Sequence, residues 1–197
     1  GNYQTNRNNR VINRKATGTF TIDFENTTNV SFTVDREFEY LEDDFDIRPG
    51  LTIVHGQYTN TRYRGSFRSD GTKTISGTVN VNGGDFFSGT SFGGGMSTTI
   101  RAHPQIFASA NYNYSKVEIP EGDFQTNLIS IRLSYAFNTE LYIKGFFQWV
   151  DDALLFDDRN QVSQNIILRY IYKLGSDFYL VYNQENLLGS GNDVTTN

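Results

Sequence analysis

Arginine, lysine and amide side chains recur at alternate positions in three apolar segments of the C-terminal half of the chain. The members of this set are Arg132, Lys144, Gln148, Asn165 and Arg169. Successive side chains of a strand point to opposite faces, so these residues share one face if the segments are neighbouring strands. Such groups could line an aqueous passage, or they could hold a plug through hydrogen bonds and ion pairs. We favour a packed or plugged interior, because two aromatic residues, Tyr142 and Phe146, lie at positions of the same parity.

Two acidic segments could offer oxygen ligands to Ca²⁺. One runs from Glu39 to Gly50 and contains the calcium candidates Asp43, Asp44 and Asp46. The other contains Asp151, Asp152, Asp157 and Asp158. Neither segment has the spacing of an EF-hand loop, so we predict solvated loops and no bound metal.

The sequence shows no recognisable catalytic constellation. His55 and His103 are the only histidines, and neither has the spacing of a metal site or a triad. The glycine-rich stretch 83–95 lacks the Lys-Ser/Thr of a phosphate loop, and no G-x-S-x-G elbow is present. Paired loop carboxylates could serve a glycosidase, but a loop fixes no separation between them. We therefore lean against an enzyme, rank a surface hydrolase last among the hypotheses, and expect no cofactor.

The elements that would hold the polar set are long β-strands. Apolar and polar residues alternate with a period of two from Asn127 to Phe137 and again from Leu141 to Trp149. Each run is about ten residues long, whereas strands of soluble proteins cluster at about five or six. One apolar face and one polar face on strands of this length are typical of a membrane barrel wall. The residues predicted to face lipid or to form aromatic girdles are Tyr112, Tyr114, Ile129, Ile131, Leu133, Tyr135, Phe137, Phe147, Trp149, Tyr170, Tyr172, Phe178 and Tyr182.

Similar alternation predicts about ten strands in all. They are expected at 14–25, 29–38, 51–68, 73–82, 90–101, 105–118, 127–137, 141–149, 163–173 and 177–184. We place a bulge between Tyr58 and Tyr63, where the apolar parity slips. Short connections should alternate with longer ones, as turns and outside loops do in outer-membrane barrels. The longer ones are expected at 39–50, 83–89, 119–124, 151–162 and from 185 onward.

The amino-acid composition excludes several classes of protein but does not by itself determine the fold. The 197 residues allow one domain, and no run of eighteen apolar residues exists, which excludes a transmembrane helix. Aromatic residues make up 15% of the chain, unlike a disordered protein. A net charge of -5 argues against nucleic acid as a partner, and the absence of cysteine removes disulfides and thiolate metal sites. A soluble β-sandwich remains the alternative fold.

We divide the chain into an irregular segment 1–13, a barrel 14–186 and a polar loop or tail 187–197. No signal peptide is visible at Gly1, and the tail lacks the aromatic-ended strand that would close a barrel. We therefore expect a fragment of a larger barrel rather than a closed barrel of ten strands.

Several short stretches resemble a known family. They are Gly84-Asp85-Phe86-Phe87-Ser88-Gly89, Phe147-Gln148-Trp149, Asn165-Ile166-Ile167-Leu168-Arg169-Tyr170 and Gly175-Ser176-Asp177-Phe178-Tyr179-Leu180-Val181-Tyr182-Asn183. Together, over roughly residues 50–187, they are similar to the C-terminal barrel region of the DUF5916 family of Bacteroidetes-type and related Gram-negative bacteria. In that family a domain similar to family 9 carbohydrate-binding modules precedes the barrel. The resemblance implies an outer-membrane barrel with a link to saccharides, and this chain departs from it by lacking the sugar-binding module.

The predicted fold is an all-β, antiparallel, up-and-down transmembrane β-barrel in the outer membrane of a Gram-negative bacterium. The predicted function is a pore or surface anchor linked to saccharide handling, with Arg132, Lys144, Gln148 and Arg169 setting the interior chemistry. The alternative is a non-transporting barrel that scaffolds a larger envelope complex. The expected partners are outer-membrane lipid and other envelope proteins.

Overall fold

The computed structural model describes residues 1–5, 11–152, 159–173 and 175–189. The regular secondary structure of these residues consists of β-strands alone. The described residues contain no helix that is long and apolar enough to cross a membrane.

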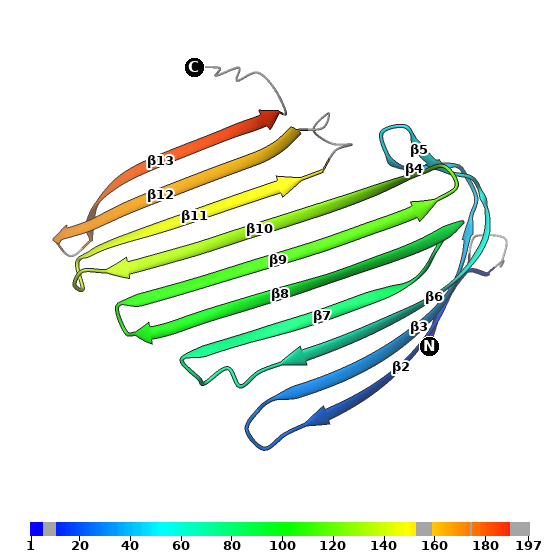
Figure 1. The fold of residues 1–197 in the computed structure, drawn as a ribbon, viewed down its shortest axis with the longest axis horizontal. Coiled ribbons are helices and arrows are strands. Elements are labelled where there is room, and N and C mark those ends of the chain that lie inside the picture. Colours follow the sequence, from blue (N-terminus) through cyan, green and yellow to red (C-terminus); the bar gives the residue numbers. More distant parts are fainter. Residues whose placement is uncertain (6–10, 153–158, 174, 190–197) are drawn as a thin grey trace. The chain divides into compact units, whose positions relative to one another are not determined.

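Eleven strands form one up-and-down antiparallel sheet, and two short strands form a separate hairpin (Figure 1). The order across the sheet is β1-β2-β3-β6-β7-β8-β9-β10-β11-β12-β13, so the hairpin β4–β5 is the one insertion between strands that are neighbours in the sheet. The strands are β1 (Asn2–Thr5), β2 (Val11–Asp23), β3 (Asn29–Leu41), β4 (Phe45–Arg48), β5 (Leu51–Ile53), β6 (Gly56–Arg68), β7 (Ile75–Phe86), β8 (Gly89–His103), β9 (Ile106–Ile119), β10 (Gly122–Ala136), β11 (Leu141–Asp151), β12 (Arg159–Lys173) and β13 (Ser176–Gly189).

The topology confirms the coarser part of the predicted fold. The chain is all-β, antiparallel and up-and-down. Within the described residues, β1 and β13 stand at opposite ends of the strand order and do not pair with each other.

The chain forms two compact units. Unit 1 comprises Gly1–Arg68, Val79–Gly94 and Tyr114–Gln125, and unit 2 comprises Ser69–Thr78, Gly95–Asn113 and Thr126–Asn197.

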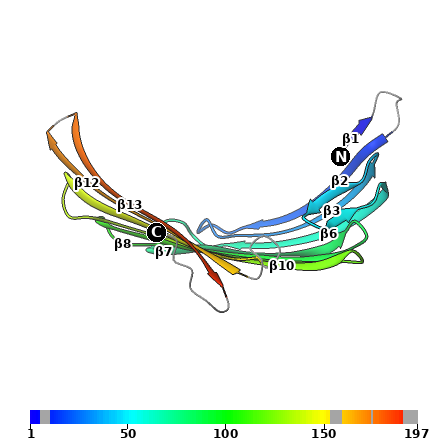
Figure 2. The same cartoon turned by 90° about the horizontal axis from the view of Figure 1, so that it is seen from above.

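The register of unit 2 follows the period-two pattern of the sequence. Ile131 stands opposite Phe147 on β10 and β11, and Ile143 of β11 stands opposite Leu168 of β12. Residues directly opposite each other in an antiparallel pair share a face. One face of β10–β13 therefore gathers the aliphatic and aromatic side chains, and we call it the apolar face. We call the other the polar face. Strands β12 and β13, seen together in Figure 2, extend the apolar face through the pair Leu168–Leu180 and the polar face through the pair Asn165–Asn183.

Unit 1 has the same two faces on β2, β3 and β6, which lie side by side in Figure 2. Phe20 of β2 stands opposite Phe32 of β3, and Val34 of β3 stands opposite Tyr63 of β6. The intervening residues, such as Thr17 opposite Asp35, are polar. Both units thus combine one apolar and one polar face.

The compact apolar core lies in unit 1, on the polar-face side of the sheet. Ile53 of the hairpin is 0% exposed and packs with Val117 and Ile119 of β9, which are 5% and 6% exposed. Further apolar side chains surround these three, namely Leu41, Ile47, Tyr58, Phe86, Phe87 and Phe124. Figure 1 shows the hairpin beside the beginning of β10.

Several predicted boundaries differ from the structure. The segment 1–13 contains β1 and the start of β2, because Asn2–Thr5 pair with Val11–Lys15 in spite of their polar composition. The expected third strand, 51–68, is instead β5 followed by β6. Strand β13 continues through Leu187 and Leu188 to Gly189, into the expected tail.

The predicted bulge between Tyr58 and Tyr63 is wrong, because β3 and β6 keep an unbroken register from Asn29 to Leu41. The apolar parity slips there for another reason. Tyr58 lies on the polar-face side and packs edge-on against Phe87 in the core, with ring centroids 5.2 Å apart.

Two predicted long loops are also wrong. Only Phe87 and Ser88 separate β7 from β8, and only Pro120 and Glu121 separate β9 from β10. The glycine residues that suggested a loop at 83–89 lie instead within the strand ends. The strict alternation of short and long connections therefore does not hold in the structure.

Candidate functional site: the polar face of the sheet

Arg169 is held firmly on the polar face of unit 2. Its Nε donates a hydrogen bond to Asp177 Oδ2 at 2.8 Å, and a terminal nitrogen donates to the Tyr142 hydroxyl at 2.9 Å. The Tyr179 hydroxyl donates to the same Asp177 oxygen at 3.2 Å. The guanidinium carbon also lies 5.5 Å from the ring centroids of Tyr142 and Tyr179. With its charge matched by Asp177, Arg169 organises the polar face of unit 2 and contributes little net charge to it.

Arg132 and Lys144 have a different environment on the same face. The Arg132 guanidinium carbon lies 5.1 Å from the Phe146 ring centroid, and the Lys144 ammonium lies 4.9 Å from the Tyr142 centroid. Both side chains are exposed, and neither belongs to an ion pair within the described part of the chain. Because Lys144 stands opposite Ser134, it is a diagonal neighbour of Arg132 across β10 and β11. The two cations keep an uncompensated positive charge that would attract anions.

Gln148 and Asn165 complete the predicted polar set. Gln148 stands opposite Ser130 and Ser163, and the Asn165 amide donates to the Asn183 side-chain oxygen. A shallow hollow of about 390 Å³ lies beside them, lined by Phe146, Ser163, Gln164, Asn165, Asn183, Gln184 and Glu185. The register brings all five residues predicted from the sequence onto one face.

The polar face of unit 1 carries a charge network that the sequence pattern did not reveal. Asp35 is only 6% exposed, and its carboxylate accepts a hydrogen bond from Thr17 at 2.7 Å and one from Arg64 at 3.4 Å. Lys15 lies 3.8 Å from Asp35 and 3.9 Å from Glu37. These partners come from three strands, so only the strand register brings them together.

The hairpin β4–β5 is the second feature that the sequence reasoning missed. Its Arg48 guanidinium carbon lies 4.3 Å from the Phe124 ring centroid, and Leu51 approaches Gly122 at the start of β10. At its far end, the Tyr58 hydroxyl donates to the Val54 carbonyl at 2.6 Å. The hairpin is thereby packed against the polar-face side of unit 1 and occupies space there.

Two of the calcium candidates, Asp43 and Asp44, lie in the loop before this hairpin, and the third, Asp46, lies in β4. The Asp44 carboxylate accepts hydrogen bonds from the backbone N–H of His55 at 2.7 Å and from the His55 ring at 2.8 Å. These two bonds lower the pKa of the Asp44 carboxyl below its ordinary value of 3.8, and the bond from the backbone N–H has the larger effect. Asp46 accepts instead from the Thr52 hydroxyl. Asp43, Asp44 and Asp46 do not converge, and no group of three or more possible ligands gathers among the described residues.

The second acidic segment lies at the end of β11. Asp152 is 1% exposed and accepts from the Thr126 hydroxyl at 2.7 Å, and Asp151 accepts from the Asn127 amide at 3.2 Å. Asp157 and Asp158 lie outside the described residues. The described members of this segment tie β10 to β11.

The stretch from Gly84 to Gly89 has a structural role in unit 1. The Asp85 carboxylate accepts from the Thr61 backbone N–H at 2.9 Å, and the Asn60 side chain accepts from the Phe87 backbone N–H at 2.8 Å. Gly84 has φ +141°, and a Cβ there would lie 2.2 Å from the Thr61 carbonyl oxygen. The motif therefore locks the β7–β8 turn against β6.

The residues predicted to face lipid gather on the apolar face. The register aligns Ile129 with Trp149, Tyr135 with Ile143, and Tyr170 with Phe178. The rings of Tyr135 and Phe137 meet edge-on, with centroids 4.7 Å apart. Tyr112 joins the same side through a 2.9 Å hydrogen bond to Asn127, and the Tyr114 ring lies 6.5 Å from that of Phe92 in unit 1.

Comparison with models of protein families, with curated proteins and with solved structures gives no match to this chain.

Proposed function

We propose that this chain is part of the wall of a transmembrane β-barrel in the outer membrane of a Gram-negative bacterium. In this proposal the apolar face contacts lipid and the polar face contacts water or packed polar groups. Such a wall acts as a pore or as a surface anchor.

The observation that carries the proposal is the exposure of large apolar side chains on one face of each unit. Leu133 is 57% exposed in unit 2, and Phe20 is 65% exposed in unit 1. Single exposed apolar residues are normal on soluble proteins, but unbroken rows across neighbouring strands are not. Lipid contact removes this surface from water at no cost to the hydrogen-bonded polar face. A soluble sandwich would instead need a second sheet packed on the apolar rows.

As a pore wall, the polar face would prefer anions near Arg132 and Lys144. Their charges have aromatic partners rather than carboxylates, so they remain available to passing solutes. Arg169 is matched by Asp177 and would act by holding Tyr142 in position. A solute would then pass a fixed positive potential rather than form a tight complex.

One observation favours the second candidate function, a sealed barrel that scaffolds an envelope complex. The hairpin β4–β5 packs on the polar-face side of unit 1 through Ile53 and fills space that an open pore would leave to water. A link to saccharide handling rests on the resemblance to the DUF5916 family. In the proposal, this link to saccharides would require a companion sugar-binding domain that acts together with the barrel.

Extraction and bilayer conductance test the proposal together. We expect the protein to need detergent, to migrate differently in a gel before and after boiling, and to conduct in planar bilayers. A protein that remains dissolved in buffer without detergent would refute the lipid-facing assignment. A barrel without conductance that copurifies with partners at fixed stoichiometry would replace the pore by the scaffold.

A further inference from the structure

We propose that the apolar face of unit 1 carries a site for the phosphate group of a membrane lipid, formed by Arg14 and Arg36. This inference rests on the proposed position of the apolar face in a membrane, and it adds a specific headgroup chemistry to it.

The two arginines interrupt the apolar rows near one end of the strands. Along β3 the apolar-face residues run from Val30, Phe32 and Val34 to Arg36, and the aromatic residues Phe38 and Tyr40 follow. On β2 they run from Ile22 and Phe20, through Gly18 and Ala16, to Arg14, and Ile12 follows. An apolar band that gives way to guanidinium groups set among aromatic residues matches the headgroup region of a lipid leaflet, where basic and aromatic side chains gather.

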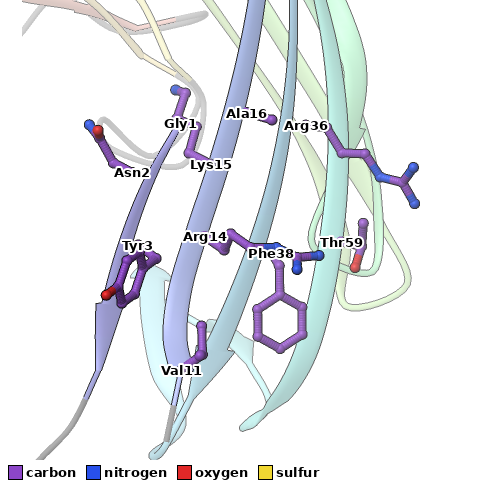
Figure 3. Close-up of a pocket in the computed structure, with 10 residues that line it drawn as sticks. All are labelled: Gly1, Asn2, Tyr3, Val11, Arg14, Lys15, Ala16, Arg36, Phe38 and Thr59. Atoms are coloured by element: carbon purple, nitrogen blue, oxygen red, sulfur yellow. The ribbon is translucent and has the colours of Figure 1, made fainter. Parts of the chain in front are cut away.

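The register makes the two arginines neighbours. Arg14 stands opposite Phe38, and Ala16 stands opposite Arg36, so Arg14 and Arg36 are diagonal partners on β2 and β3. Diagonal positions on one face are about 7–8 Å apart, a separation that two long side chains can bridge around one phosphate. Figure 3 shows Arg14 beside Phe38, with Thr59 of β6 next to them.

A pocket accompanies the pair. It has a volume of about 630 Å³, and its lining includes Arg14, Lys15, Arg36, Phe38 and Thr59 (Figure 3). Three of these residues are cationic, and none of the described lining residues is acidic. Lys15 is matched by Asp35 and Glu37 of the polar face, which leaves Arg14 and Arg36 as the uncompensated charges.

Neither arginine is used by the fold. Both side chains are exposed, and within the described part of the chain neither forms a hydrogen bond, an ion pair or a ring contact. A guanidinium group binds phosphate oxygens through paired N–H donors, which an ammonium group does not reproduce. Two such groups beside Phe38 and Val34 suit an amphiphile that carries a phosphate at the end of an acyl chain. Free phosphate would use the charges but leave the apolar rows uncovered.

The test is a binding measurement on the full chain in non-ionic detergent. The probe is a short-chain phosphatidic acid, compared with the diacylglycerol of the same chain length and with inorganic phosphate as a competitor. The variant is Arg14→Gln with Arg36→Gln, and the matched control is Arg68→Gln. Arg68 is an exposed arginine on the polar face of unit 1, where it stands opposite Asn29, and it has no side-chain partner within the described residues. The heat-dependent gel shift reports whether each variant folds.

We expect the affinity of the double variant for phosphatidic acid to be lower by about tenfold or more, because two charge-assisted contacts are lost. The Arg68→Gln control should bind as the parent protein does, and inorganic phosphate should compete poorly. Equal binding by the double variant and the parent, or an equal loss in Arg68→Gln, would overturn the site. Full competition by inorganic phosphate would show a free-anion site instead. These outcomes are separable from failure of the barrel itself, which would appear as solubility without detergent.

Discussion

Arg132 and Phe146 stand directly opposite each other on β10 and β11, and the guanidinium carbon of Arg132 lies 5.1 Å from the centroid of the Phe146 ring. The ring orients the cation without neutralising it, because an aromatic quadrupole carries no net charge. A carboxylate at position 146 would have produced a local ion pair. The polar face of unit 2 therefore keeps the positive charge that a solute would meet.

Arg132→Ala should reduce the preference for anions of the reconstituted protein. The variant removes a charge from the polar face, while the lost ring contact costs only about 0.5–1 kcal/mol of stability at an exposed site. Reversal potentials in a salt gradient across a planar bilayer measure the preference. Arg36→Ala is the matched control, because it removes an arginine from the opposite, apolar face of unit 1. An unchanged reversal potential in Arg132→Ala would contradict a role in selectivity.

Ile53→Ala should release the hairpin β4–β5. Ile53 is 0% exposed, and truncating a buried isoleucine typically costs about 2–5 kcal/mol. Because the hairpin is a local unit, we expect faster proteolysis and faster hydrogen exchange at 42–55 with little change in the sheet. The control is Val54→Ala, since the neighbouring Val54 side chain is 49% exposed. Equal protection in both variants would show that the Ile53 contacts do not hold the hairpin.

The same variant separates the two candidate functions. If the hairpin narrows a pore, Ile53→Ala should raise the single-channel conductance while Val54→Ala leaves it unchanged. A protein that stays silent after the hairpin is released is a sealed barrel, as the scaffold hypothesis requires.

The loop at Asp44 should respond to acid. The hydrogen bonds from His55 lower the pKa of the Asp44 carboxyl, so they favour the folded loop above the ordinary value of 3.8. This contribution is lost as the pH falls below 3.8 and through the lowered pKa, where the carboxylate is protonated. The protection factor of the His55 amide, which corrects its exchange rate for the intrinsic dependence on pH, should fall over that window when the pH is lowered from 6 to about 2. Asp44→Asn should have a low protection factor at every pH and show no such transition; a transition that persists in this variant would assign it to another group.

Gly84→Ala should destabilise the β7–β8 turn. Its φ of +141° disfavours any residue with a Cβ, and the added carbon would meet the Thr61 carbonyl oxygen at 2.2 Å. We expect a loss of at least about 1–3 kcal/mol in urea unfolding in detergent. Gly65→Ala is the control, because a Cβ at Gly65 meets nothing within 4 Å. Equal stability of the two variants would show that β6 moves aside at Thr61.

The alternation of Ile129, Ile131 and Leu133 with Ser130 and Arg132 was enough to predict the strands and their faces. Periodicity is a local property, and the sheet preserves it because each residue has one neighbour on either side. The faces of unit 2 were therefore readable from the chain alone. What lies beyond each face was not readable, and it remains a prediction.

The features that escaped prediction depend on partners far away in the sequence or on elements too short to show a period. Asp35 gathers Thr17 and Arg64 from two other strands, and no local pattern signals that. Strands β4 and β5 have four and three residues, fewer than an alternation test needs. Gly84 and Gly89 suggested a loop, but they allow close backbone approach within strand ends. The change of apolar parity at Tyr58 suggested a bulge, but it arises because the Tyr58 ring packs against Phe87 in the core.

The strand order also bears on how the chain reaches its native state. The strands of the sheet pair in the order in which they occur in the sequence. Most strand pairings therefore close only a short loop, and the loop-closure entropy that they cost is small. Hairpins such as β10–β11 could therefore form early and independently of one another. The contacts of the hairpin β4–β5 with β9 and β10 are different. The contact of Ile53 with Val117, for example, waits for β6, β7 and β8 to be in place between them. The hairpin β4–β5 would dock last, and the polar-face side of unit 1 would stay open until assembly is nearly complete.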